Sequence, residues 1–116
     1  MQKNGSILLM SSHMGITPHS ISVAYGVSKA ALCHMAKCLV KEFAELDVTV
    51  NAVAPGIVET GVQINLPDEI KNSKVSKTAA GRFATAEEIA DLCYHMLHNR
   101  FINGSVYAID GGYNYK

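Results

Sequence analysis

Residues 48–56 read Val-Thr-Val-Asn-Ala-Val-Ala-Pro-Gly, a run of β-branched and small residues that ends at Pro55-Gly56. An apolar run without polar alternation is typical of a strand buried on both faces of a parallel sheet. The Pro-Gly pair ends the run, because proline lacks the N–H that a strand ladder uses and glycine favours a turn. The segment therefore predicts a buried strand over residues 48–54.

Two shorter runs of the same character lie toward the two ends of the chain. Residues 5–12 read Gly-Ser-Ile-Leu-Leu-Met-Ser-Ser, and residues 105–110 read Ser-Val-Tyr-Ala-Ile-Asp before Gly111-Gly112. Each is a short run bounded by small polar residues or glycine, which indicates a further strand. Three strands are therefore expected, all of them buried on both faces.

Helical periodicity separates these three strands. Apolar residues recur at helical spacing up to Phe43, which predicts a helix over about residues 23–45. Thr85, with Glu88 three positions later, has the pattern of a capping box and predicts a second helix, which Asn99 closes.

The stretch between the second strand and the second helix follows no period. Residues 57–82 are irregular, although Pro67 and the two acidic residues after it could begin a short helix. Irregular stretches of this length inside a compact domain are often lids or binding loops.

Strands and helices thus alternate in the order βαβαβ. Right-handed crossovers then give a parallel sheet with helical layers, so the predicted class is α/β, a partial Rossmann-like fold built as one unit over residues 1–116. Ligands of such sheets bind at the carboxyl ends of the strands. Here those ends are Ser11-Ser12, Pro55-Gly56 and Asp110-Gly111-Gly112.

Composition argues against several classes of function. The 116 residues include 10 Lys+Arg, 10 Asp+Glu and 48% hydrophobic residues, as in one soluble globular domain. Zero net charge offers no basic field, so we expect neither nucleic acid nor a membrane surface as partner. The apolar runs are too short to span a bilayer and no secretory signal is visible, so a cytoplasmic location is expected.

The cysteines and histidines give no sign of a metal site. Cys33, Cys38 and Cys93 are odd in number and lack C-x-x-C spacing, which predicts reduced core thiols. His95 and His98 lie three positions apart without an H-E-x-x-H motif, and a solvated helix face explains them. No metal is therefore predicted.

Tyr25 and Lys29 lie four positions apart at the start of the long predicted helix, so their side chains share one face. A phenol ordinarily has a pKa of ~10, and a fixed cation nearby favours the phenolate, which can then exchange protons closer to neutral pH. Ser12, at the end of the first strand, would lie near this helix start and hold a substrate oxygen beside the phenol. Taken alone, a Tyr–Lys pair at this spacing is more typical of a helix surface than of a catalytic site.

The order of motifs along the whole chain is more specific than this pair. The motifs are Ser12, Tyr25, Lys29, Asn51-Ala52-Val53-Ala54-Pro55-Gly56-Ile57-Val58-Glu59-Thr60, Gly81-Arg82-Phe83, Glu87-Glu88-Ile89-Ala90, Asn103-Gly104 and Asp110-Gly111-Gly112. In this order and spacing, the chain from Gly5 to Tyr115 resembles the short-chain dehydrogenase/reductase family. Within it, the sequence is most similar to the 3-oxoacyl-acyl-carrier-protein reductase group.

The resemblance implies a set of catalytic roles. Tyr25 matches the family's general acid/base, and Lys29 matches the residue that lowers the pKa of that tyrosine and binds the nicotinamide ribose. Ser12 matches the hydroxyl that orients the substrate carbonyl. The implied reaction is hydride transfer between NADP or NAD and a small carbonyl or alcohol substrate.

The resemblance also implies where the cofactor lies. Pro55 and Gly56 would line the nicotinamide pocket, the Val58 backbone would meet the carboxamide, and Thr60 would lie near the carboxamide or the pyrophosphate. Residues 61–78 fall where relatives have a substrate-binding lid.

The family's first half, with its glycine-rich phosphate turn, has no counterpart here. The resemblance therefore covers the C-terminal half of a reductase domain, without the N-terminal phosphate-binding half or the residue that selects NAD or NADP. The strand Ser6–Met10 would then lose its inner neighbour and expose an apolar edge. Gly111-Gly112 cannot replace the missing turn, because no helix follows them.

Two functions stay open. The first is an NAD(P)-dependent oxidoreductase, and the second is a truncated non-catalytic α/β module that self-associates or binds a partner. The resemblance implies a homo-oligomer that associates through the long helix and through the C-terminal strand and helix. Candidate interface residues are Leu32, Met35, Leu39 and Tyr107.

Overall fold

The computed structural model describes residues 4–18 and 22–114, so Tyr115, where the resemblance ends, lies outside the described residues. It contains a parallel sheet of three strands in the order β1 (Ser6–Met10), β2 (Thr49–Pro55) and β3 (Val106–Ile109). The register pairs Leu8 with Asn51 and Val53 with Tyr107. The predicted α/β class and the three strands are confirmed.

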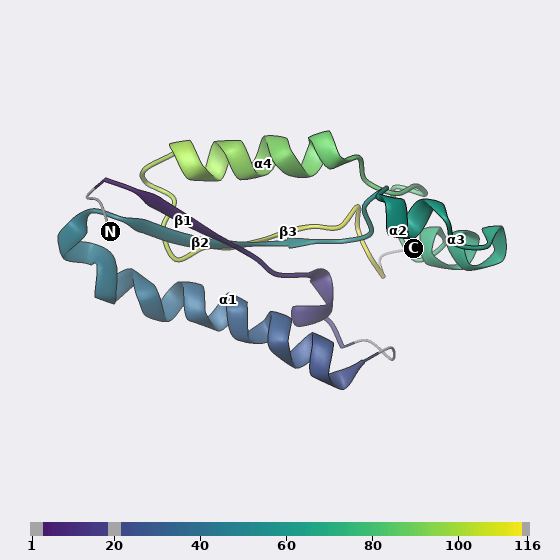
Figure 1. Cartoon of the computed structure of the whole chain (residues 1–116), viewed down its shortest axis with the longest axis horizontal. Coiled ribbons are helices and arrows are strands. Elements are labelled where there is room, and N and C mark those ends of the chain that lie inside the picture. The colour runs from purple at the N-terminus through teal and green to yellow at the C-terminus, as the bar shows by residue number, and fades with distance from the viewer. Residues whose placement is uncertain (1–3, 19–21, 115–116) are drawn as a thin grey trace.

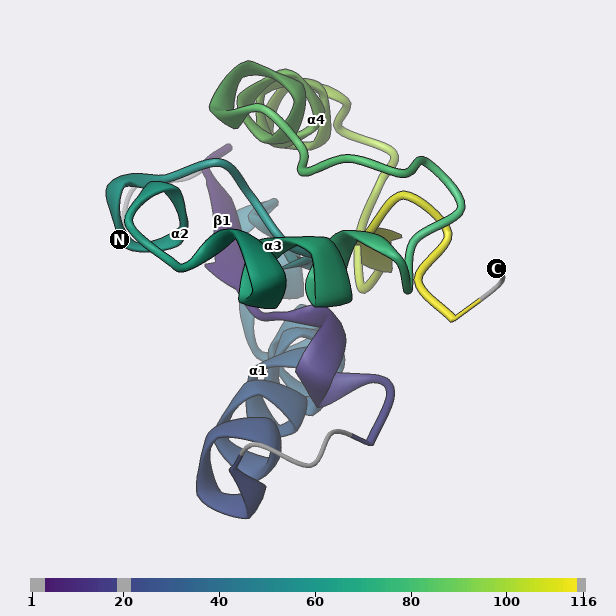
Figure 2. The same cartoon turned by 90° about the vertical axis from the view of Figure 1, so that its right-hand side faces the viewer.

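One long helix covers each face of the sheet. Helix α1 (Val23–Phe43) packs below the sheet and α4 (Ala86–His98) above it, as Figure 1 and the end-on view of Figure 2 show. The predicted helix over residues 23–45 is confirmed, although its last turn is a 3-10 helix over Ala44–Leu46. The left-handed Asp47, with φ of 52°, then turns the chain into β2.

The core sits between β2 and α1. Ala36, Val50 and Ala52 are fully buried against one another, because small residues let the helix and the strand approach closely. Ile7, Leu9, Leu39, Phe43 and Val106 pack around them.

Asn51 is the polar exception within the buried strand, at 1% exposure. Its amide nitrogen donates to the Ile102 carbonyl at 2.9 Å, and its Oδ1 accepts from the Ser105 N–H at 2.9 Å. Both hydrogen bonds fasten the segment that leads into β3, so the buried amide is satisfied and sets the position of that strand.

The prediction that all three strands are buried on both faces is wrong for β1 and β3. Residues Thr49–Ala54 of β2 are buried, whereas Met10 of β1 is 46% exposed and Tyr107 of β3 is 57% exposed. Within the described residues, β2 alone has a strand on each side, and the two outer strands are edges. The exposed apolar edge predicted for residues 6–10 is therefore present.

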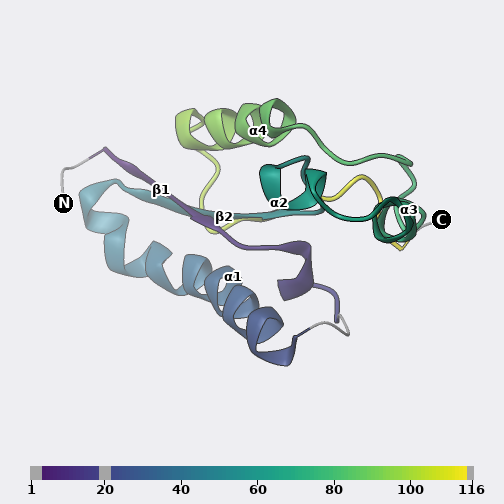
Figure 3. The same ribbon diagram turned by 45° about the vertical axis from the view of Figure 1, so that its right-hand side comes forward.

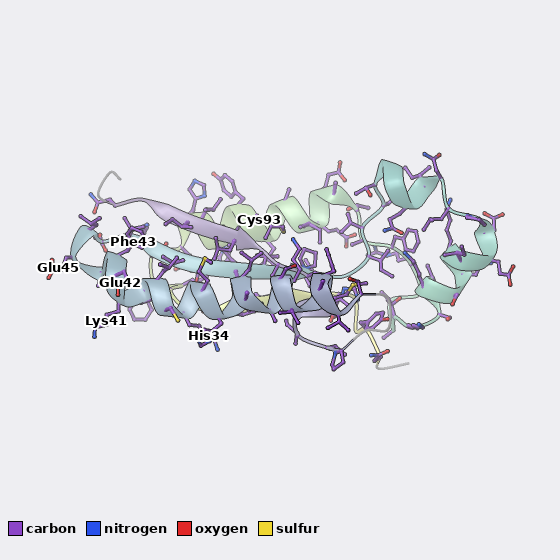
Figure 4. All side chains as sticks on the ribbon, turned by 60° about the horizontal axis from the view of Figure 1, so that its bottom comes forward. His34, Lys41, Glu42, Phe43, Glu45 and Cys93 are labelled. Atoms are coloured by element: carbon purple, nitrogen blue, oxygen red, sulfur yellow. The ribbon has the colours of Figure 1, made fainter. Side chains whose placement is uncertain are left out.

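The expectation that all three cysteines are core thiols is also corrected. Cys38 is exposed on α1, so it is not a core thiol, while Cys33 and Cys93 are half-buried. Val27, an apolar residue of α1, is 64% exposed. His34 and Lys41 project outward from the same helix, as Figure 4 shows.

The irregular stretch contains two short helices that the sequence signals did not fully reveal. They are α2 (Gly61–Ile64) and α3 (Asp68–Val75), with Pro67 preceding α3 as expected. Both lie beyond the carboxyl ends of the strands, at the same end as the C-terminal segment (Figure 3).

The predicted capping box of α4 is confirmed. Thr85 Oγ1 accepts from the Glu88 N–H at 3.2 Å, and the Glu88 carboxylate accepts from the Thr85 N–H at 2.9 Å. Arg82 adds a bidentate ion pair to Glu88 at 2.7 and 2.9 Å. These contacts hold the pKa of Glu88 well below its usual range, at about 2, chiefly through the hydrogen bond from Arg82.

Candidate active site

A cavity of about 780 Å³ opens at the carboxyl ends of the strands. Its walls come from the loop after β1, the first turn of α1, the loop after β2, and α2 and α3 with the residues that follow them. Of the seven residues predicted for the site, five line it: Ser12, Tyr25, Gly56, Val58 and Thr60. The remaining two do not line the cavity but contact residues that do: Lys29 contacts Tyr25, and Pro55 contacts His13.

The loop after β1 is held against α1. Ser12 is 8% exposed, and its Oγ accepts from the Met14 N–H at 3.2 Å, which starts the 3-10 turn His13–Gly15. Ser11 Oγ donates to the Lys29 carbonyl at 2.7 Å. Gly15 permits this contact, because a Cβ there would lie 2.7 Å from the Ala30 nitrogen.

Tyr25 and Lys29 share one face of α1, as their spacing predicts. The Lys29 Nζ lies 5.6 Å from the centroid of the Tyr25 ring and donates to the Met10 carbonyl at 3.1 Å. The ammonium therefore stands between the aromatic ring and the end of β1. Tyr25 itself is 44% exposed, so its ring is reachable from the cavity.

The loop after β2 is brought close to the end of β3. The Gly56 N–H donates to the Ile109 carbonyl at 2.9 Å, and a Cβ on Gly56 would lie 2.8 Å from the Asp110 Cα. Glycine is therefore required at this approach of two strand ends. Beyond it, Val58 forms a bridge with Ala84, which directs the chain toward α2.

His13 is a cavity residue that the sequence reasoning missed. It is 5% exposed, and its Nδ1 lies 3.1 Å from the Pro55 carbonyl oxygen. A carbonyl only accepts, so Nδ1 carries a proton in this arrangement. The signal available in the sequence was its place directly after Ser12 at a strand end.

Tyr113 was missed as well, because a long-range pairing brings it to the cavity. The Ala79 N–H donates to the Gly112 carbonyl at 3.1 Å, and the Asn114 N–H donates to the Lys77 carbonyl at 2.7 Å. The Tyr113 ring then lies 4.5 Å from the His13 ring, tilted by 55°.

The other described histidines lie on the helices, away from the cavity. His98 stacks on Tyr94 with ring centroids 4.0 Å apart. Over residues 4–18 and 22–114, no group of three or more His, Cys, Asp or Glu side chains is placed to hold a metal ion. In that same part of the chain, none of the helices has the length and apolar character needed to cross a membrane.

Comparison with known proteins places this chain in a family. The family model described as enoyl-(acyl carrier protein) reductase matches residues 1–114. The 3-oxoacyl-acyl-carrier-protein reductase of Thermotoga maritima is 37% identical over 113 residues, which cover 96% of this chain and 46% of that protein. The chain thus spans about half the length of the curated relatives it matches.

Solved structures agree with the sequence relatives. A Serratia marcescens short-chain dehydrogenase/reductase mutant superposes with a TM-score of 0.89 at 27% identity, covering 98% of this chain and 47% of that one. A 4-hydroxyisoleucine dehydrogenase complexed with NADH superposes with a TM-score of 0.85 at 25% identity, covering 97% and 48%. This chain belongs to the short-chain dehydrogenase/reductase family.

Proposed function

We propose that residues 1–116 form the C-terminal half of an NAD(P)-dependent short-chain dehydrogenase/reductase that acts on a small carbonyl or alcohol. The observation that carries this proposal is the convergence of Ser12 and Tyr25 on one cavity at the carboxyl edge of the sheet, with Lys29 behind Tyr25. The glycine-rich phosphate turn belongs, in this proposal, to the other half of the domain.

Ser12 and Tyr25 act on the substrate oxygen. Because Ser12 Oγ accepts the Met14 N–H, its hydroxyl keeps its own proton for donation to that oxygen. Tyr25 gives a proton to the oxygen during reduction and takes it back during oxidation. The Lys29 ammonium places positive charge beside the ring on which negative charge develops.

The loop after β2 suits a nicotinamide cofactor. The glycine at position 56 keeps the two strand ends in contact, and Val58 and Thr60 extend the same wall of the cavity. When bound, NAD or NADP supplies or accepts the hydride. Gly56, Val58 and Thr60 would hold the nicotinamide end, and Pro55 would shape the turn from behind while its carbonyl binds His13.

A cofactor titration tests this proposal. We expect saturable binding of NADH or NADPH to the full chain, followed by nicotinamide fluorescence, and at least tenfold weaker binding in Lys29→Met. The matched control is Lys37→Met, because Lys37 is exposed on the same helix and does not line the cavity. Equal effects of both substitutions would contradict the proposed site. No saturation up to ~10 mM cofactor would mean that binding needs the other half of the domain, where the proposal puts the phosphate turn.

A non-catalytic, self-associating module is the second candidate, and exposed apolar side chains favour it. Val23 of α1 is 81% exposed, Phe101 is 99% exposed, and the edge strand β3 leaves Tyr107 at 57%. Of the proposed interface residues, Met35 is 44% exposed whereas Leu39 packs on the core. A homo-oligomer would therefore use Met35 and Tyr107, and Met35→Lys with Tyr107→Lys should lower the mass measured by light scattering.

A further inference from the structure

Two lysines line the cavity on the wall formed by α3. Lys74 lies in the last turn of this helix, and Lys77 follows it. Neither was singled out as a site residue by its sequence context, because lysines near a helix C-terminus are common and offset the helix dipole. The helix dipole does not explain why both lysines line the cavity, because a lysine on any face of the last turn can offset the dipole equally well.

The charge of these two lysines is not neutralised within the described residues. The Lys74 Nζ donates to the Gln63 Oε1 at 3.2 Å, and Gln63 is a neutral amide that also lines the cavity. The ion pairs recorded over residues 4–18 and 22–114 are Arg82–Glu88 and Arg100–Asp47, both away from α3. The amide thus holds the Lys74 ammonium in place and leaves its positive charge intact.

One acidic residue shares this wall, so its net charge has to be counted. Glu69 lines the cavity from the first turn of α3, where it is favourable for the helix dipole. It forms no ion pair with either lysine. Two positive charges against one negative charge leave the α3 wall positive.

The wall that holds the reacting groups comes from other elements. Ser12 and Tyr25 come from the loop after β1 and from α1. Lys74 comes from α3, and Lys77 from the residues that follow this helix. Apolar residues line the same cavity, among them Ile57 and Ile70. A ligand that fills it meets a hydroxyl and a phenol, an apolar stretch and a pair of ammonium groups.

We infer that the substrate carries an anionic group, a carboxylate or a phosphate, which Lys74 and Lys77 bind while Ser12 and Tyr25 hold the reacting oxygen. This inference rests on the proposed function for the identity of the reacting end. The anionic end is recognised by charge-assisted hydrogen bonds, which are stronger than those between neutral groups. Gln63 positions Lys74 for that contact.

The test compares pairs of ligands with the same carbon skeleton at the carbonyl end, one member of each pair being anionic and the other neutral. Chemical-shift titrations of the full chain by ¹H–¹⁵N NMR would use 6-oxoheptanoate against its methyl ester, and 5-oxohexyl phosphate against 6-hydroxyhexan-2-one. We expect the anionic member of at least one pair to bind about tenfold more tightly than its neutral partner. The pair that shows the larger ratio identifies the anion as carboxylate or phosphate.

Variants assign the preference to the two lysines. In Lys74→Gln with Lys77→Gln the anionic and neutral members should bind within about twofold of each other. The matched control is Lys71→Gln, since Lys71 lies on α3 and does not line the cavity, and it should keep the preference. Equal binding by the unmodified chain, a preference that survives in the double variant, or no saturation up to ~50 mM would overturn the inference.

The two experiments can distinguish a failure of the anionic-substrate inference from a failure of the proposed oxidoreductase function. Lys29-dependent cofactor binding together with equal affinity for acid and ester would retain the oxidoreductase proposal and overturn the anionic substrate. An anion preference that depends on Lys74 and Lys77, in a chain whose cofactor binding is affected equally by Lys29→Met and Lys37→Met, would retain the anionic ligand and contradict the proposed cofactor site. A double variant that weakens NADPH binding and leaves the acid unaffected would assign the lysines to the cofactor and overturn the inference.

Discussion

The start of α4 and the carboxyl edge of the sheet are both held by polar contacts, but they are assembled in different ways. At α4, the residues that contact one another are Arg82, Thr85 and Glu88, which are neighbours in sequence. At the carboxyl edge, Ser12 meets residues from as far along the chain as Tyr113 in one cavity. The start of α4 can be predicted from the sequence because its contacts are local. The cavity at the carboxyl edge forms only when the chain folds and brings distant residues together.

The largest expected effect comes from a substitution at the carboxyl edge that removes the proton donor and leaves the packing of the cavity unchanged. In a chimera that joins residues 5–114 to the remaining half of the Thermotoga maritima reductase, Tyr25→Phe should lower turnover of a 3-oxoacyl thioester about a thousandfold. The ring and its packing are kept and only the proton donor is lost, so the cofactor Kd should change less than threefold.

The unsubstituted chimera must turn over for this comparison to hold. Steady-state kinetics and a cofactor titration on the same preparations measure the two effects separately. Turnover by the Tyr25→Phe chimera at the unsubstituted rate would remove Tyr25 from the catalytic role.

The second-largest effect comes from a substitution that disrupts the packing of the same edge, between the loop after β1 and α1. In Gly15→Ala the new Cβ would lie 2.7 Å from the Ala30 nitrogen, so the loop after β1 must move away from α1. We expect a loss of about 2 kcal/mol in the free energy of unfolding, as for other over-packed sites. Urea unfolding measures it.

A second glycine provides the control for this substitution. A Cβ on Gly61 would meet nothing within 4 Å, and Gly61 begins α2. Gly61→Ala should therefore leave the stability unchanged or raise it by up to ~1 kcal/mol, since alanine favours a helix. If both variants lost the same free energy of unfolding, the close approach of Gly15 to α1 would not be the cause of the loss.

The smallest effect concerns the start of α4 and depends on pH. The folded pKa of Glu88 is lowered to about 2, first by the hydrogen bond from Arg82 and then by the Thr85 N–H. A lowered pKa contributes stability that is present above the unfolded pKa of ~4.3 and is lost as pH falls through the folded value. Stability should therefore decline between about pH 4.3 and pH 2 as Glu88 becomes protonated.

The variant Glu88→Gln isolates this charge. Glutamine satisfies the capping box, so the hydrogen bond to the Thr85 backbone is kept while the ion pair to Arg82 is lost. The difference in urea midpoint between the original chain and the variant should be present at pH 7, shrink toward pH 2, and shrink also in 1 M salt, because the pair is exposed. A difference independent of pH and salt would mean that the charge plays no part.

The three-strand, two-helix order was predictable because each element has a local signal. The buried run of residues 49–54, the cap at Thr85 and the Tyr25–Lys29 spacing all hold in the structure. Burial of the outer strands was predicted wrongly, because an apolar run does not say whether a neighbour lies on each side. Met10 and Tyr107 lie on the two outer strands, and both side chains are exposed.

The sequence by itself determined which residues could carry chemistry, since side-chain type and spacing within one helix or one strand end are local properties. Ser12, Tyr25 and Lys29 became candidates in this way, and their roles were predicted from the resemblance of the whole motif order to a family. Tertiary structure alone decided what surrounds them. His13 contacts Pro55, and Lys74 faces the same cavity as Tyr25, because the crossover connections bring strand ends and α3 together. Contacts of this kind depend on the closure of long loops, and no local pattern in the chain encodes them.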